Sequence, residues 1–196
     1  MTIRSSVRAR FARFISIAFH PFMLFPVAVS LVTAPRLSQQ QQSWVLGGIA
    51  MSFFCVSVYV GVQMKRGVIG NIDVSKREQR PALYAVAIAS TLACAALFHF
   101  LVLPQSIVQG ALISAGLLTV ALIANTKLKV SLHMAYTIFA IGIGWPALPS
   151  GIRAFSLVLI VLMGWSRVEM KRHTLPEVIA GAVLGSLAVV ALMNLY

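Results

Sequence analysis

The chain has 196 residues, of which 59% are hydrophobic and only 10% are charged; soluble domains carry roughly 25% charged residues. This composition excludes an ordinary water-soluble domain and predicts that the lipid bilayer is the main solvent. The formal net charge of +12 would suggest nucleic acid binding in a soluble protein. Basic residues beside apolar spans instead set topology or contact lipid phosphates, so we expect no nucleic acid partner.

Seven apolar stretches follow one another along the chain. They cover residues 15–34, 44–64, 82–103, 107–124, 134–148, 154–165 and 177–195. Their lengths and spacing predict an all-α, polytopic transmembrane bundle of about six to seven helices. We expect a single integral-membrane domain over 1–196, with a basic N-terminal segment, the first span and a loop in 1–43. Cys55 and Cys94 lie inside apolar stretches without metal-type spacing, which indicates core residues.

The first stretch contains His20-Pro21 and Pro26. Proline removes a helical hydrogen bond and clashes with the preceding turn, so the sequence predicts a kink or a break in this span.

The fifth and sixth stretches are short. Only the 32 residues from 134 to 165 are available for two passes, which allows about 24 Å each at ~1.5 Å per residue. A hydrocarbon core is ~30 Å thick. Either the turn at Pro149 lies below the far surface, or the residues around Ser166 lie within the membrane.

Basic residues are distributed unevenly between the two ends of the predicted bundle. If all seven stretches cross, the N-terminus and the segments 65–81, 125–133 and 166–176 share one face. The positive-inside rule makes that face cytoplasmic, which predicts a protein of a bacterial inner membrane. Only Arg36 and Arg153 lie opposite the 14 basic residues of this face, which are Arg4, Arg8, Arg10, Arg13, Lys65, Arg66, Lys76, Arg77, Arg80, Lys127, Lys129, Arg167, Lys171 and Arg172.

The four acidic residues, Asp73, Glu78, Glu169 and Glu177, belong to the same face. Their concentration beside basic residues indicates a site in which charges are paired. The alternative is a set of solvated loops at the membrane surface.

The first polar segment places cations just before a span. Lys76 and Arg80 are four residues apart, and Arg77 and Arg80 are three apart, so in a helix they would share a face. Such a group suits phosphate oxygens. The alternative is a basic topology signal before a helix.

The second segment ends with Ser131 and His133 at the start of a span, close to the aqueous boundary. Imidazole can donate a proton near neutral pH, although a lone histidine is more often structural.

The third segment runs from Ser166 to Glu177 and places His173 four residues before Glu177. A carboxylate at this spacing can hold one ring nitrogen while the other attacks phosphorus, and Arg167 can neutralise charge on the transferred group. The alternative is a surface pair at a helix start, worth about 0.5 kcal/mol.

These residues resemble the motifs of the integral-membrane type 2 phosphatidic acid phosphatases, a superfamily related to bacterial acid phosphatases and vanadium haloperoxidases. The motif S-R-x5-H-x3-D is matched by Ser166-Arg167, His173 and Glu177, with Glu in place of Asp. The motif P-S-G-H is matched only by Ser131 and His133. The motif K-x6-R-P retains Arg80-Pro81, with Asp73 in the lysine position.

The resemblance covers about 65–185 and implies a phosphatase-like core within 44–196 that needs no metal or cofactor. It implies that His173 forms a phospho-histidine, that Glu177 orients it and that His133 protonates the leaving group. The phosphoryl oxygens would be bound by Arg80, Arg167, either Lys76 or Arg77, and backbone donors near Ser131.

The substrate that the resemblance implies is a lipid phosphate, because a site among apolar helices suits a phosphate on a lipid tail. A polyprenyl or isoprenyl phosphate or diphosphate, or a lipid-linked phosphosugar, is favoured. Other than membrane lipids no partner is implied, and the oligomeric state is open.

Two other functions remain open at this level. A membrane prenyltransferase is suggested by Asn71, Asp73 and Arg80-Pro81, but it needs several carboxylates around Mg²⁺. The corresponding loop of this chain has only two carboxylates, Asp73 and Glu78. A non-enzymatic transporter or assembly protein would use the basic face for orientation and its intramembrane polar groups to hold helices together.

Overall fold

The computed structural model describes residues 7–70, 74 and 76–195. Over these residues the protein is all-α, with eight α-helices and no strand. The α-helices are α1 (Val7–Ala18), α2 (Pro21–Thr33), α3 (Gln39–Lys65), α4 (Arg80–Phe100), α5 (Gln105–Ala124), α6 (Leu132–Gly144), α7 (Ser150–Glu169) and α8 (Leu175–Met193). Two short 3-10 helices, η1 (Arg77–Gln79) and η2 (Trp145–Ala147), precede α4 and follow α6.

Five of these elements are long and apolar enough to cross a membrane, namely α3, α4 together with η1, α5, α7 and α8. The bent pair of α1 and α2 provides a sixth candidate span. The predicted all-α transmembrane bundle is thereby confirmed, and the protein is an integral membrane protein. Each predicted apolar stretch overlaps a helix, and the first stretch is divided between α1 and α2.

The break between α1 and α2 confirms the predicted effect of the prolines. The two helices are bent by 41°. Pro21 opens α2, where its missing N–H costs nothing, and His20 caps that helix because its Nδ1 accepts the Phe22 N–H at 3.1 Å. Pro26 lies inside α2 without ending it.

The short fifth and sixth stretches are unequal in the structure. Helix α6 has 13 residues, about 20 Å at ~1.5 Å per residue, and does not reach the length of a full span. Helix α7 has 20 residues and continues through Ser166 and Arg167, both buried. Both residues therefore belong to the helix rather than to the loop that follows it.

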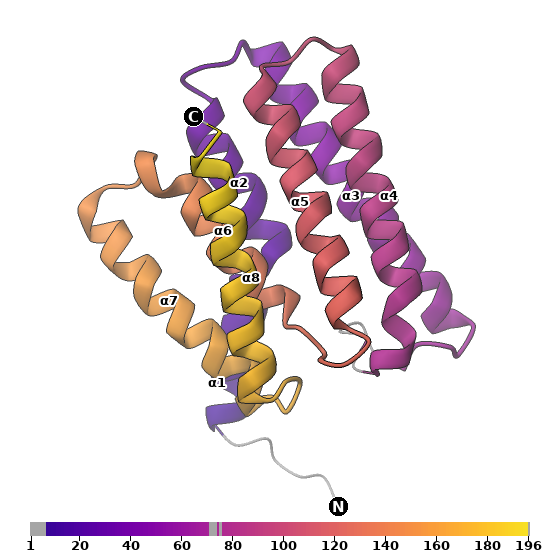
Figure 1. The fold of residues 1–196 in the computed structure, drawn as a ribbon. Coiled ribbons are helices and arrows are strands. Elements are labelled where there is room, and N and C mark those ends of the chain that lie inside the picture. The colour runs from indigo at the N-terminus through magenta and orange to yellow at the C-terminus, as the bar shows by residue number, and fades with distance from the viewer. Residues whose placement is uncertain (1–6, 71–73, 75, 196) are drawn as a thin grey trace, which may run out of the picture.

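The helices are arranged across the bundle from α3, α4 and α5 to α7 (Figure 1). Helices α3, α4 and α5 lie together on one side of the view, α7 lies at the opposite edge, and α2, α6 and α8 lie between them. The starts of α1, α4, α6 and α8 and the ends of α5 and α7 gather at the lower end. The polar segments predicted to share one face therefore do share one end of the bundle.

Two glycines bring α8 unusually close to α6. A Cβ at Gly181 would lie 2.5 Å from the Ser131 carbonyl oxygen, and a Cβ at Gly185 would overlap the Ala135 carbonyl. Small residues four apart allow helix backbones to approach closely in membranes. The Ser131 N–H also donates to the Glu177 carbonyl at 3.1 Å. The first turns of α6 and α8 consequently lie side by side, which brings His133 near His173.

Candidate active site

Hydrogen bonds connect the polar segments at this end of the bundle. The Arg80 guanidinium donates to the Val130 carbonyl at 3.1 Å, and the His173 ring contacts the Lys129 carbonyl at 3.1 Å. Arg167 donates to Ser16 of α1 at 2.7 Å. The three segments singled out in the sequence, together with the first helix, therefore build one site.

His173 lies in the α7–α8 turn, and its side chain is only 2% exposed. Its Nδ1 is 3.1 Å from the Lys129 carbonyl oxygen and 3.2 Å from a carboxylate oxygen of Glu177. Because both oxygens are acceptors, Nδ1 carries a proton, and in the neutral ring the lone pair is then on Nε2. Burial, reinforced by the nearby Arg80 and Arg167, lowers the pKa of His173 to about 3. The ring is therefore neutral at physiological pH, with an unprotonated Nε2.

Glu177 has two structural contacts besides His173. Its carboxylate accepts the Thr174 N–H at 3.0 Å, which caps the start of α8. It also lies 4.0 Å from the Lys129 ammonium group. The side chain is 15% exposed, so the pair of His173 and Glu177 is an interior pair, in contrast to the exposed surface pair considered as the alternative.

The lowered pKa of His173 predicts an acid-sensitive fold. Below the ordinary histidine pKa of about 6.5, the unfolded chain binds a proton that the folded chain rejects until the pH approaches 3. Stability is then lost as the pH falls below about 6.5, by about 1.4 kcal/mol per pH unit for this group. We expect the thermal midpoint in detergent to fall between pH 7 and pH 5, and to fall less in His173→Asn. Parallel declines in the two proteins would contradict the buried, neutral ring.

Arg80 and Arg167 are buried, with 6% and 1% of their surface exposed. Arg80 opens α4 and donates from Nε to the Val74 carbonyl at 3.0 Å. Arg167 is part of the last turn of α7. Both line the cavity that His173 lines. Because guanidinium groups stay charged, this end of the cavity is electropositive and suited to an anion with several oxygens.

His133 lies in the first turn of α6 and lines the same cavity. Its Nε2 is buried and has no hydrogen-bond partner among the described residues. The ring is edge-on to the ring of His20, with 4.7 Å between centroids. The predicted proton donor is thus at the cavity, beside a histidine that the motif analysis did not consider.

Ser131 has a structural position. It is fully buried, its hydroxyl caps α6 by accepting the Met134 N–H at 3.5 Å, and its own N–H is engaged by Glu177. It is not among the described residues that line the cavity. The Ser131 amide is therefore engaged within the fold, and the expectation of backbone phosphate donors near Ser131 stays a prediction.

Lys76 and Arg77 are exposed. Arg77 belongs to η1, donates to the Lys127 carbonyl at 3.2 Å, and lies 3.8 Å from Glu78. It lines a separate surface pocket, and neither it nor Lys76 is among the described residues of the main cavity. The predicted shared face with Arg80 does not form, because the α-helix starts only at Arg80, whose side chain turns inward. Asp73 and Arg4 lie outside the described residues.

Four residues of the site lie outside the sequence motifs. Ser16 and His20 come from the first span and line the cavity, as does Arg172, one residue before His173. Lys129 contacts His173 through its carbonyl. His20-Pro21 was visible in the sequence as a helix break, which was its only signal.

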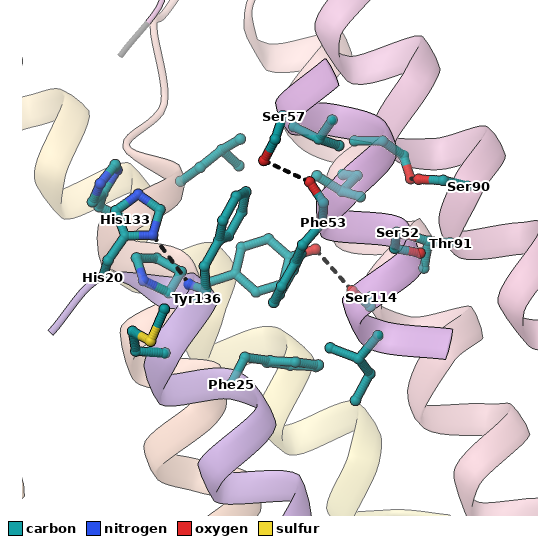
Figure 2. A pocket seen from close by; sticks show the side chains of 18 of the residues that line it. His20, Phe25, Ser52, Phe53, Ser57, Ser90, Thr91, Ser114, His133 and Tyr136 are labelled. Atoms are coloured by element: carbon teal, nitrogen blue, oxygen red, sulfur yellow. Dashed lines mark hydrogen bonds between the residues drawn. The ribbon is translucent and has the colours of Figure 1, made fainter. Parts of the chain in front are cut away.

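The cavity has a volume of about 850 Å³. From the cationic end it extends between α2, α3, α4 and α5, and its lining along α3 runs from Met64 to Val45, about 28 Å of helix at ~1.5 Å per residue. Figure 2 shows aromatic rings and hydroxyl groups on its walls. The Ser114 hydroxyl is hydrogen-bonded to the Tyr136 hydroxyl at 2.8 Å, and the Ser52 hydroxyl is hydrogen-bonded to the Cys94 sulfur at 3.1 Å. With these hydroxyls satisfied, the chamber away from the cationic end is effectively apolar.

Among the described residues, no group of three or more His, Cys, Asp and Glu side chains is arranged to hold a metal ion. At the cationic end of the cavity, the described lining residues supply imidazole and guanidinium groups. Comparisons of the chain with protein-family models, with curated proteins and with solved structures give no match.

Proposed function

We propose that this protein is a metal-independent phosphatase of a lipid-linked phosphate and that it acts through a phospho-histidine on His173. One observation carries the proposal: a single cavity joins a buried, neutral His173 and two buried guanidinium groups, Arg80 and Arg167, to a long apolar chamber. The cationic end suits a phosphoryl group. The chamber suits the apolar chain attached to it.

The residues supply each step of the reaction. The lone pair on Nε2 of His173 attacks phosphorus, and the bond from phosphorus to the lipid oxygen breaks. The bound phosphate dianion stabilises the imidazolium form of His133, which donates its Nε2 proton to the departing alkoxide and becomes neutral. Arg80 and Arg167 neutralise the charge that builds on the phosphoryl oxygens. Glu177 stabilises the imidazolium that results, because it already faces Nδ1.

Hydrolysis then restores the site. His133, now neutral, takes a proton from a water molecule, and the resulting hydroxide attacks phosphorus. The bond between phosphorus and Nε2 breaks, the electron pair returns to His173, and inorganic phosphate leaves. No proton or electron is gained or lost by the protein over the cycle.

The length of the chamber suits an isoprenoid chain. An extended chain covers about 1.2 Å per bond, as the polypeptide backbone does, so the about 28 Å of lining along α3 corresponds to roughly 23 bonds. An isoprenoid of about 20 to 25 carbons is within this length.

The basic residues support a cytoplasmic site. Helix α1 carries Arg8 and Arg10, which are not among the lining residues of the cavity, as well as Arg13, which is. The positive-inside rule assigns basic residues such as Arg8 and Arg10 to the cytoplasm. In a bacterial inner membrane the substrate would then lie in the inner leaflet, where lipid phosphates are made.

Phosphate release by purified protein in detergent with EDTA tests the proposal. The panel is a C10 and a C20 prenyl phosphate, a C20 prenyl diphosphate and phosphatidic acid. We expect metal-independent release with a preference for prenyl substrates. In His173→Asn, the amide can still donate to the Lys129 carbonyl, but no nitrogen nucleophile is left, so we expect a fall in rate of about 10³-fold or more.

If His173→Asn keeps the thermal midpoint of the parent protein but no longer releases phosphate, this result would support the histidine mechanism. Release abolished by EDTA, or unchanged in His173→Asn, would overturn it. If no member of the panel releases phosphate, the non-enzymatic transporter or assembly protein becomes the better explanation.

The two rival functions fit the site less well. A prenyltransferase needs carboxylates to hold Mg²⁺, yet no Asp or Glu is among the described residues that line the cavity, and Glu78 is 76% exposed beside Arg77. A scaffold could use the hydrogen bonds of the two buried guanidinium groups, but it needs no cavity that joins them to a long apolar chamber.

A further inference from the structure

His20 lies in the break between α1 and α2 and is held firmly there. Its backbone is extended, its Nδ1 accepts the Phe22 N–H at 3.1 Å, and its ring packs edge-on against the Phe22 ring at 4.8 Å. Because Nδ1 is an acceptor, the proton of the neutral ring is on Nε2. Any hydrogen bond that the neutral His20 ring donates must therefore come from Nε2.

The ring of His20 meets that of His133 at the cationic end of the cavity. The centroids are 4.7 Å apart, the planes are nearly perpendicular at 88°, and both side chains line the cavity. Figure 2 shows the two rings close together, His133 from α6 and His20 from the break before α2. The first span thus reaches the site beside the proposed proton donor, although this span lies outside the region of sequence resemblance.

The Nε2 atom of His133 is the informative feature. It is buried and has no hydrogen-bond partner among the described residues, which is costly for a polar atom unless a ligand or substrate completes the site. A substrate oxygen bound at Arg80 and Arg167 would supply that partner.

We infer that His20 is a positioning residue for His133: its ring packs edge-on against the His133 ring and so holds Nε2 of His133 toward the leaving oxygen. The inference rests on the proposed function. In the first step the Nε2–H of His133 passes its proton to the alkoxide, and in the second step Nε2 regains one from water. His20 keeps its own proton throughout.

The substitution His20→Asn isolates this role. Asparagine is a good helix cap and can still accept the Phe22 N–H, so the break is kept while the ring is removed. We expect kcat for a prenyl phosphate to fall about 10- to 100-fold, part of the effect of a general acid, with KM changed less than about 2-fold because the phosphoryl contacts remain. The control is His99→Asn at the exposed end of α4, which should behave as the parent protein.

A double-mutant cycle with His133→Gln decides whether His20 acts through His133. If it does, adding His20→Asn to His133→Gln lowers kcat no further. Independent, multiplying effects, or a His20→Asn variant indistinguishable from His99→Asn, would overturn the inference while leaving His173-dependent release intact. If the protein shows no His173-dependent release, the proposed function fails and this inference fails with it.

Discussion

The Arg167→Gln variant is expected to hydrolyse its lipid phosphate with a kcat/KM about 10²- to 10³-fold below that of the parent protein. Arg167 is 1% exposed, lines the cavity beside His173 and donates to Ser16. A preorganised donor in a dry site typically contributes this much to stabilising transition-state charge. Glutamine can keep the bond to Ser16 but lacks the charge. Phosphate release and the thermal midpoint should be measured together, so that lost folding is separated from lost catalysis.

Arg77→Gln and Lys76→Gln are the matched controls. Both side chains belong to the basic face, but Arg77 is 44% exposed, and neither residue lines the cavity. We expect changes below about 3-fold, because exposed charges are screened by water and salt. If either control loses as much activity as Arg167→Gln, phosphate binds at the exposed segment before α4, and the buried cluster is not the phosphate site.

The Gly110→Phe variant is expected to prefer short chains. Gly110 lines the chamber on α5, toward the end away from His173, and a Cβ there meets nothing within 4 Å. A phenyl ring would therefore fill the far part of the chamber and displace the end of a C20 chain. Each CH₂ kept out of the chamber forfeits about 0.8 kcal/mol, so two or three such groups lower kcat/KM roughly 10- to 50-fold. A C10 chain ends before reaching the ring and should be hydrolysed as before.

Gly116→Phe is the control for this prediction. Gly116 is on the same helix, is exposed, and also has open space around its Cβ, but it is not a lining residue. The measurement is the ratio of kcat/KM for C20 and C10 prenyl phosphates at fixed detergent. If Gly110→Phe and Gly116→Phe keep the same ratio, the apolar chamber does not hold the lipid tail.

Much of the architecture could be predicted from local properties of the chain. Whether a segment spans a bilayer depends on the apolarity of about 20 consecutive residues, and the break at His20-Pro21 depends on one proline ring. The alternation of spans then places the three polar segments at one end without any knowledge of packing. The contact between His173 and Glu177 was also predictable from local sequence, because the two residues are four apart and lie on either side of the first residue of α8.

The direction in which individual side chains point was harder to predict from the sequence. Lys76, Arg77 and Arg80 are close in sequence, yet only Arg80 enters the cavity. Which side chain enters the cavity depends on where η1 ends and α4 begins. Moving a helix start by one residue rotates the following side chains by about 100°. For Ser131, the close approach of α8 at Gly181 engages the amide with the Glu177 carbonyl, a contact that no local sequence pattern predicts.

The sequence by itself determined that the chain is a membrane bundle, where its first helix breaks, and that His173, Glu177 and Arg167 lie at its basic end. Tertiary structure alone decided that Lys129 holds His173 across 44 residues, that Arg167 reaches Ser16 across 151 residues, and that His20 meets His133. It also decided that α2 to α5 enclose an apolar chamber. The physical reason is that spanning, breaking and pairing within one turn depend on neighbouring residues, whereas a cavity and its long-range contacts depend on how whole helices pack.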